Sequence, residues 1–335
     1  MTPRIKAAFA TNSGLLTRQQ AEVAGLDGHQ IDRLVREGAW VAVRRGVYAE
    51  RELWEGLDSY RERQLYVSRA ASKTITLPHV MSHDSAALEI GMSVLLPRPF
   101  LPHVTRPDVR GSRHRYGVKH HGAVFHASQV VDVDGIDVLN AARTAVDIGR
   151  EHGILHGLAA CDSALRLGCS RRQLELAYEP MACWPGIRMA REAVELADGG
   201  AESLGESLGR SLVLELGIGR PQTQFGLRDE SGRVAWCDMR VGRHVFEFDG
   251  RVKYQRRQEG GLAELSPDEV VWHEKQRQDW VCGLGLGMSR IVWADVLGKG
   301  RQKALIRLAR EYEQTLRRYG DRIEDLAPYI IRRPR

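Results

Sequence analysis

The sequence has few cysteines and no long apolar run, and these absences exclude several classes of protein. Its five cysteines are scattered, and no two of them form a CxxC pair. This argues against a disulfide framework and against a cysteine-rich zinc site, and it suits a reducing cytoplasm. No window approaches the roughly 18 consecutive apolar residues that indicate a membrane span, and residues 1–14 lack the apolar core of a signal peptide. We therefore expect a cytoplasmic protein with no membrane association.

Internal repeats and low-complexity segments are also absent, so we expect ordinary globular domains. The 335 residues, 43% hydrophobic and 27% charged, suffice for two or three of them. The formal charge of +6 is compatible with nucleic-acid binding and decides nothing about the fold. The hydrophobic patterns predict an α/β multidomain protein. Its expected parts are a winged helix-turn-helix (1–57), a mixed α+β middle domain (58–198), an α/β domain (199–298), and a C-terminal helix with a basic tail (299–335).

The N-terminal segment carries signals for two short helices and a hairpin. Thr17 is a suitable N-cap for a helix over 18–24, and Asp27 for a second helix over 28–37. Residues 40–48 read as two short strands around a basic turn. Helix, tight turn, helix and basic hairpin is the order of a winged helix-turn-helix, whose second helix enters the major groove of DNA.

The polar residues of the second helix and of the hairpin are the candidate DNA contacts. Ile31, Leu34 and Val35 fall on one helical face, which leaves a polar face opposite. Glutamine and arginine can make paired hydrogen bonds to base edges, and arginines of a wing can contact phosphates or the minor groove. The alternative is a winged domain used for protein contact, with its charges merely solvated. The predicted DNA-binding residues are His29, Gln30, Arg33, Arg36, Arg44 and Arg45.

The run GLLTRQQAEVAGLDGHQIDRLVREGAWVAVRRGVYA resembles the N-terminal domain of AbiEi-family antitoxins, which belong to type IV toxin–antitoxin systems. The later runs SHDSAALEIG, VDGIDVLNAARTAVDIGR and WPGIRMAREAVELAD resemble longer proteins that carry this domain, so the resemblance covers about the first 200 residues. It implies a cytoplasmic DNA-binding regulator that represses its own operon. A cognate toxin protein and a second copy of the chain, as a homodimer, are the candidate protein partners.

The middle segment contains a basic, histidine-rich stretch over 98–126. Clustered cations of this kind displace counterions from DNA, which favours a phosphate-facing surface. Adjacent His120 and His121 would point to opposite faces of a strand, which argues against a shared metal ion. The remaining interpretations are a solvated hairpin and, third, zinc binding by the histidines. The five histidines of the stretch are His103, His114, His120, His121 and His126.

Four acidic residues indicate a metal site in the third segment. Residues 244–249 read as a strand on which Glu247 and Asp249 point to the same face. A hairpin partner strand places Asp238 beside them, and Glu206 lies on the preceding helix. Converging carboxylates suit Mg2+, which can activate a water molecule for phosphodiester hydrolysis. The predicted ligands of Mg2+ or Mn2+ are Asp238, Glu247 and Asp249.

The order helix, three strands, helix, strand in this segment resembles the core of PD-(D/E)XK nucleases. The run GESLGR…PQTQ…WCDMRVGRHVFEFDGRVKY…EKQRQDW…SRIVW resembles the branch related to very-short-patch-repair endonucleases, over about 100 residues. The resemblance implies a restriction-endonuclease-like αβββαβ core. One position departs from the pattern, because Asp249 stands where the E-x-K motif has lysine, so Lys253 or Lys275 would have to supply the cation. The catalytic residues so implied are Glu206, Asp238, Glu247, Asp249 and Lys253.

Two functions follow from these patterns. The first is a Mg2+-dependent DNA endonuclease of phage defence or repair, delivered to DNA by the winged domain. The alternative is an AbiEi-like antitoxin or transcriptional autorepressor whose nuclease-like domain is catalytically inert. The structural alternative to a metal site is that Asp249 and Gly250 form a turn ending a strand, and that Glu247 pairs with an arginine such as Arg277 or Arg290.

Overall fold

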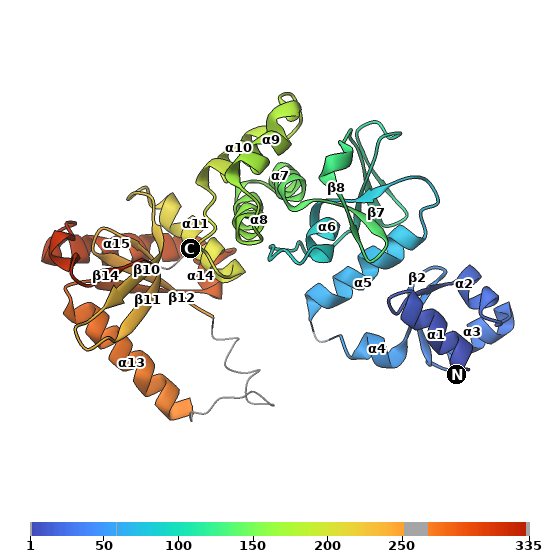
Figure 1. Ribbon diagram of the computed structural model, residues 1–335, viewed down its shortest axis with the longest axis horizontal. Helices are drawn as coiled ribbons and strands as arrows, with labels where there is room; N and C mark the ends of the chain where they lie inside the picture. The colour runs from blue at the N-terminus through green and yellow to red at the C-terminus, as the bar shows by residue number, and fades with distance from the viewer. Residues whose placement is uncertain (1, 58, 251–266, 333–335) are drawn as a thin grey trace. The chain divides into compact units, whose positions relative to one another are not determined.

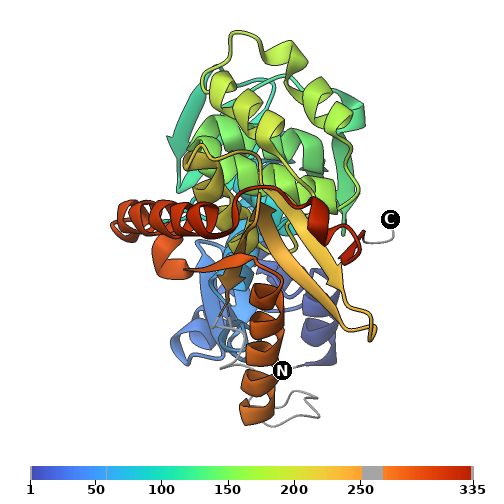
Figure 2. The ribbon, with the colours of Figure 1, turned by 90° about the vertical axis from the view of Figure 1, so that its left-hand side faces the viewer.

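The computed structural model describes residues 2–57, 59–250 and 267–332, and the chain divides into two compact units (Figure 1, Figure 2). Unit 1 consists of Met1–Ala160 and Cys169–Val194, and unit 2 of Cys161–Gly168 and Glu195–Arg335. Three β-sheets run through the described residues, together with helices. The mixed α/β architecture expected from the sequence is confirmed. Within the same described ranges, no helix combines the length and the apolarity needed to cross a membrane.

The N-terminal part of unit 1 has the elements of a winged helix-turn-helix. They are α1 (Pro3–Thr11), β1 (Leu16–Thr17), α2 (Arg18–Val23), α3 (Gly28–Arg36), β2 (Trp40–Arg44), β3 (Val47–Glu50) and α4 (Arg51–Glu55). Thr17 caps α2 and Asp27 caps α3, each in a capping box that also ties the glutamine three residues later to the cap N–H. β2 and β3 pair as the hairpin of the wing, and β1 pairs with β3. The two predicted helices and the hairpin are therefore confirmed.

Helix α1 was not predicted, although its side chains complete the core of this domain. Ile5 and Phe9 lie four residues apart on one helical face and are both buried. The ring of Phe9 meets that of Trp40 edge to face, with 5.1 Å between the centroids, an arrangement that aromatic quadrupoles favour. A nine-residue helix with two buried positions repeats its apolar spacing too few times for the periodicity to be recognised in the sequence.

The rest of unit 1 is built on a six-stranded sheet with the strand order β6-β7-β5-β4-β9-β8. Its strands are β4 (Val80–Met81), β5 (His103–Arg106), β6 (Ser112–Arg115), β7 (Val118–Gly122), β8 (Val130–Val133) and β9 (Ile136–Leu139). The helices are α5 (Tyr60–Lys73), α6 (His83–Glu89), α7 (Ala141–His152), α8 (Ile154–Arg166), α9 (Arg171–Tyr178) and α10 (Ile187–Leu196). The last residues of α8 and α10 belong to unit 2. Asn140 caps α7 as predicted, because its side chain accepts a 3.0 Å hydrogen bond from the Arg143 N–H.

Unit 2 shows the predicted order helix, three strands, helix, strand and the predicted C-terminal helix, and it adds α14 and β14, which were not predicted. Its elements are α11 (Leu204–Glu215), β10 (Gln222–Arg228), β11 (Val234–Val241), β12 (His244–Asp249), α13 (Pro267–Gly283), β13 (Gly287–Val292), α14 (Trp293–Val296), α15 (Gly300–Tyr319) and β14 (Ile330–Ile331). β10, β11 and β12 are antiparallel neighbours, and β13 pairs with β12 in parallel. β14 pairs with β10, so the end of the chain is part of this sheet.

A buried ion pair joins the end of α8 to α11. The Arg210 guanidinium, 3% exposed, donates hydrogen bonds of 2.6–3.2 Å to the Asp162 carboxylate, which is fully buried. Arg210 also donates to the Leu196 carbonyl at 2.7 Å, and Asp162 accepts from the Asp198 N–H at 2.7 Å. Burying one of these charges without the other would cost about 3–5 kcal/mol. Because Asp162 must stay beside Arg210, residues 161–168 pack with unit 2 although the rest of α8 belongs to unit 1.

The sheet of unit 2 carries helices on both faces. Val281 of α13 belongs to the same apolar cluster as Val245, while the neighbouring residue His244 bonds through Nδ1 to Thr315 Oγ1 of α15 at 2.6 Å. Phe248 lies on the side of α11, where a Cβ at Gly205 would come within 2.1 Å of its ring. Glycine at this position therefore permits the close approach of helix and sheet.

Gly205→Ala is expected to destabilise unit 2 by about 1–3 kcal/mol, because the added methyl would overlap the Phe248 ring. The ring has little room to move, since Trp293 holds it edge to face at 5.2 Å. Gly283→Ala, at the end of α13, is the matched control, because nothing lies within 4 Å of its Cβ position. Urea unfolding measures both variants. Equal unfolding midpoints for Gly205→Ala and the wild type would contradict this packing.

Candidate nucleic-acid interface and acidic cluster

The recognition helix α3 presents a polar face as the sequence predicts. Ile31 is fully buried, and Leu34 and Val35 pack against the same apolar cluster. On the opposite face His29, Arg33 and Arg36 are exposed. Their side chains are thus free of the core and available to a macromolecular surface.

Gln30 has a structural role that the sequence analysis did not assign. Its Oε1 accepts a hydrogen bond of 2.8 Å from the Asp27 N–H, and its own N–H donates to Asp27 Oδ1 at 2.8 Å. This capping box fixes the start of α3. A Gln30 side chain held in this way is turned toward the helix end. His29, Arg33 and Arg36 are therefore better placed than Gln30 to contact DNA bases.

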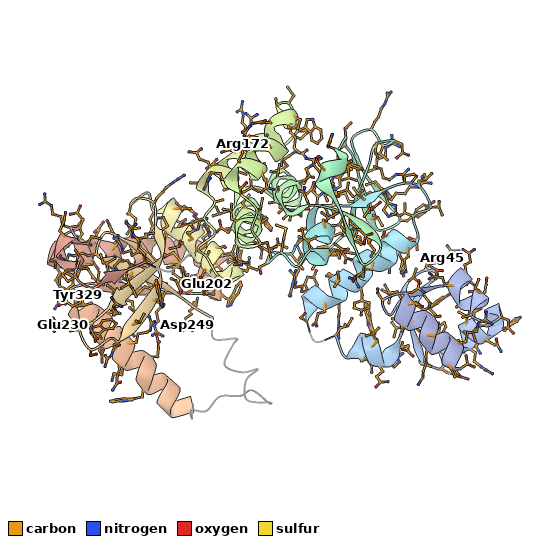
Figure 3. The ribbon with its side chains drawn as sticks, in the orientation of Figure 1. Arg45, Arg172, Glu202, Glu230, Asp249 and Tyr329 are labelled. Carbon is orange, nitrogen blue, oxygen red and sulfur yellow. The ribbon has the colours of Figure 1, made fainter. Side chains whose placement is uncertain are left out.

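The two arginines of the wing differ in their surroundings. Arg45 is exposed at the turn between β2 and β3 (Figure 3). Arg44 is partly buried, and its guanidinium donates to the carbonyl of Tyr116 in the turn between β6 and β7. Burial lowers the pKa of Arg44. Arg44 therefore braces the wing against the next hairpin, whereas Arg45 remains at the surface.

The basic stretch over 98–126 separates into an exposed strand and buried histidines. Strand β6 is an edge strand whose four residues are all exposed, among them Arg113, His114 and Arg115. His103, His120 and His121 are instead buried. The prediction of a basic surface is therefore correct for β6 and wrong for these three histidines. The sequence did not distinguish the exposed arginines from the buried histidines, because neither β6 nor β7 shows a regular alternation of apolar and polar residues.

Asp238 lies where β11 and β12 stop pairing. The backbone ladder runs from Val241 opposite His244 to Met239 opposite Phe246. Beyond it, the Asp238 Oδ2 atom accepts a 2.6 Å hydrogen bond from the Phe248 N–H. Burial, followed by the nearby carboxylates of Glu247 and Glu206, raises the pKa of Asp238 to about 7. The structure thus brings these three acids close enough to interact, as the element order implied.

Each of the other acids is engaged by a neighbour. Glu247 Oε1 lies 3.3 Å from Arg277 Nη1 of α13, and Asp249 Oδ2 lies 3.7 Å from Arg290 Nη1 of β13. Glu206 acts in the cap of α11, because its two carboxylate oxygens accept from the Ser203 hydroxyl and the Glu202 N–H, both at 2.8 Å. The arginine pairing considered for Glu247 in the alternative interpretation is therefore the one observed.

The acidic residues do not fit a magnesium ion in this arrangement. Their carboxylates are already engaged by arginines, backbone N–H groups or the Ser203 hydroxyl, and among the described residues no three of them lie close enough to share an ion. Within residues 2–57, 59–250 and 267–332, the groups close enough to share a metal ion consist of histidines and Asp84, not of Asp238, Glu247 and Asp249. Lys253 lies outside the described residues, and Lys275 is exposed on α13.

The Asp238 carboxyl should make the stability of unit 2 depend on pH. A carboxyl whose pKa rises from 3.8 to about 7 on folding keeps its proton longer in the native state, so the free energy of unfolding falls as the pH rises between these values. The slope for one proton is at most about 1.4 kcal/mol per pH unit. Asp238→Asn should remove this dependence, while Glu230→Gln at an exposed turn should keep it. Urea unfolding at several pH values measures the effect, and an unchanged slope in Asp238→Asn would contradict it.

Comparison with known proteins identifies part of the chain. Residues 3–51 match the family described as transcriptional regulator, AbiEi antitoxin. Two uncharacterized proteins of Mycobacterium tuberculosis, from strains CDC 1551 / Oshkosh and ATCC 25618 / H37Rv, are each 30% identical over 184 residues. The match covers 53% of this chain and 64% of each relative, so it spans less than two thirds of their length. Residues 3–51, which contain α1 to β3 and the wing, are an AbiEi-type transcriptional regulator domain.

Proposed function

We propose that this protein is a DNA-binding transcriptional regulator of the AbiEi type that represses its own operon. The observation that carries the proposal is the exposed polar face of α3 in a winged domain that matches the AbiEi family. The buried face of α3 is fixed by Ile31, so the helix presents His29, Arg33 and Arg36 outward in one orientation. A helix of this kind reads base edges in the major groove.

A second basic surface lies next to the wing and extends the same interface. Arg44 links the wing to the turn before β7, and β6 carries the exposed Arg113 and Arg115. Together with Arg45, these arginines can neutralise phosphates, which supplies affinity and register without reading the sequence. The contacts would divide accordingly, with α3 giving specificity and the wing and β6 giving salt-dependent affinity.

The proposed partners follow from the family and from the symmetry of operators. A winged domain contacts a short site, and two copies of the chain would read two half-sites of a palindrome. A cognate toxin is the protein partner that the family description suggests. We propose both as partners to be sought together with operator DNA.

Unit 2 is proposed not to hydrolyse DNA. Glu247 is neutralised by Arg277 and Asp249 by Arg290, and the lysine of the E-x-K motif is replaced by Asp249. A metal-dependent nuclease needs free carboxylates and a cation near the attacking water. The charge pairing at β12 therefore favours a regulator over the endonuclease.

Arg33→Ala and Arg36→Ala are expected to weaken binding to the protein's own promoter by about 1–3 kcal/mol each, if their guanidinium groups contact bases. Arg45→Ala should weaken binding to all sequences and lower the slope of log K against log salt concentration by about 0.9. Arg172→Ala, an exposed arginine on α9, is the matched control. Fluorescence anisotropy with promoter and scrambled duplexes measures both effects. Wild-type affinity in Arg33→Ala and Arg36→Ala would contradict the assignment of α3.

Purified protein with Mg2+ or Mn2+ is expected to bind plasmid and single-stranded DNA without cutting either. Glu247→Gln should behave as the wild type does, because the Glu247 carboxylate is paired and not catalytic. Agarose gels with EDTA as control measure cleavage. Metal-dependent cutting that Glu247→Gln abolishes would overturn this proposal and restore the endonuclease.

A further inference from the structure

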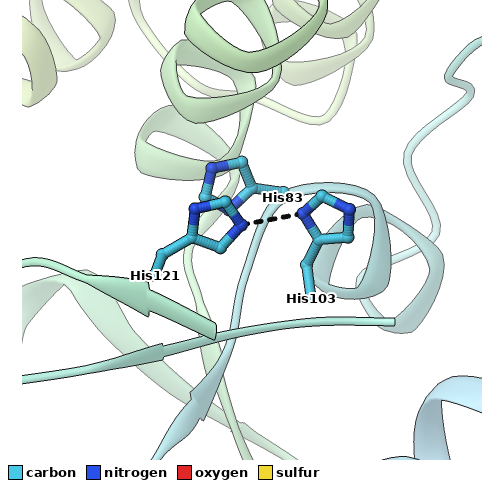
Figure 4. Close-up of side chains that lie close together, drawn as sticks. All are labelled: His83, His103 and His121. Atoms are coloured by element: carbon cyan, nitrogen blue, oxygen red, sulfur yellow. Dashed lines mark hydrogen bonds between the residues drawn. The ribbon is translucent and has the colours of Figure 1, made fainter. Parts of the chain in front are cut away.

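Three buried histidines of unit 1 come together from three different elements. His83 is the first residue of α6, His103 the first residue of β5, and His121 lies in β7 (Figure 4). One ring nitrogen of each lies within 4.8 Å of the others. The rings of His83 and His121 stack with 3.8 Å between their centroids, and His121 Nε2 lies 3.0 Å from His103 Nδ1.

We propose that His83, His103 and His121 form a binding site for one divalent transition-metal ion of the zinc class. Neutral imidazole is a preferred ligand of Zn2+, Cu2+, Ni2+ and Co2+. With Zn–N bonds of about 2.0–2.1 Å, two nitrogens of a tetrahedral site lie about 3.4 Å apart. The three ring nitrogens lie within 4.8 Å of one another, so small rotations of the rings would bring them to this spacing.

The second nitrogen of each ring faces an oxygen atom, at hydrogen-bond distance for His83 and His121 and at 3.8 Å for His103. Ser82 Oγ lies 3.0 Å from His83 Nδ1, and Ser112 Oγ lies 3.2 Å from His121 Nδ1. Asp84 Oδ2 lies 3.8 Å from His103 Nε2. Metal-binding histidines usually have such a partner, which fixes the ring and directs the other nitrogen to the ion. These partners leave His83 Nε2, His103 Nδ1 and His121 Nε2 as the ligand atoms.

The surroundings suit a cation bound to neutral rings. All three side chains are buried. Burial disfavours a charged imidazolium, and a neutral ring offers the lone pair that a metal needs. Asp84 is also buried, and its Oδ1 atom has no hydrogen-bond partner among the described residues. A negative charge beside His103 favours a bound cation.

Backbone strain at His83 is the further sign of a built site. His83 has a φ of +51°, in the left-handed region that costs a non-glycine residue on the order of 1 kcal/mol or more. This conformation starts α6 with the imidazole directed at the ends of β5 and β7. A bound ion would join helix and sheet at that point and offset the strain.

A neighbouring group, Asp84 with His103 and His152, is the competing arrangement. There Asp84 Oδ2 already accepts a 2.6 Å hydrogen bond from His152 Nε2, so an ion in this group would have to displace that bond. In the group with Asp84 and His152, His103 would have to bind the ion through Nε2, because this nitrogen faces Asp84. In the three-histidine site the same nitrogen is the one that faces Asp84, and Nδ1 is the ligand. We therefore place the ion between His83, His103 and His121, with His152 outside it.

The test is a titration of the metal-free full chain with Co2+, followed by Zn2+. One Co2+ per chain with the intense visible absorption of a tetrahedral site is expected, and Zn2+ should displace it. His103→Gln and His121→Gln should lose at least about 100-fold in affinity, and Ser112→Ala about tenfold. His114→Gln, the exposed histidine of β6, and His152→Gln should bind as the wild type does.

The outcomes separate the alternatives. Absence of stoichiometric Co2+ uptake by the wild type, or wild-type affinity in His121→Gln, would refute the site. Loss of binding in His152→Gln with retention in His121→Gln would move the ion to the neighbouring group and refute the assignment made here. If circular dichroism shows that the buried variants do not fold, the wild-type spectrum and Ser112→Ala, a substitution at an exposed position, decide the question.

Discussion

Buried arginines that must be neutralised within the same unit set the arrangement of this protein. In unit 1, Arg143 of α7 is 2% exposed and donates to the buried Asp147 at 2.8 Å, while Trp184 covers its guanidinium. In unit 2, Arg210 of α11 meets Asp162 at the end of α8. An arginine cannot be buried without such a partner at an acceptable free energy. The Arg210–Asp162 pair therefore joins α8 to α11, whereas the Arg143–Asp147 pair lies within α7 and allows that helix to bury an arginine.

Charge pairing also shapes the acidic cluster, where the arginines are only partly buried. Four acids at the spacing of a nuclease site are compatible with a metal centre as long as their neighbours are unknown. In the folded chain α13 brings Arg277 to Glu247 and β13 brings Arg290 to Asp249. Once these pairs form, the carboxylates of Glu247 and Asp249 have arginine partners. The β12 and β13 strands pair in parallel, so Arg290 is separated from its partner by a long connection that no local pattern reveals.

The basic surface and the histidine cluster arise from one stretch of sequence that the fold divides. β6 lies at the edge of the six-stranded sheet and exposes its arginines, whereas β7 lies one strand inward and buries His121. The wing meets the turn between these strands through Arg44. The exposed arginines of β6 therefore lie on the same sheet as His103 and His121 of the proposed metal site. A metal ion bound there would make β7, and with it the neighbouring β6, more rigid.

The sequence by itself determined those features that depend on neighbouring residues. The caps at Thr17, Asp27 and Asn140, the recognition helix with Ile31 inward, and the order of elements around Asp238 follow from local hydrogen bonding and from periodicity. Tertiary structure alone decided the partners of Glu247 and Asp249 and the meeting of His83 with His121. These outcomes depend on contacts between residues far apart in the chain, whose free energies are settled by burial and charge pairing and leave no periodic trace in the sequence.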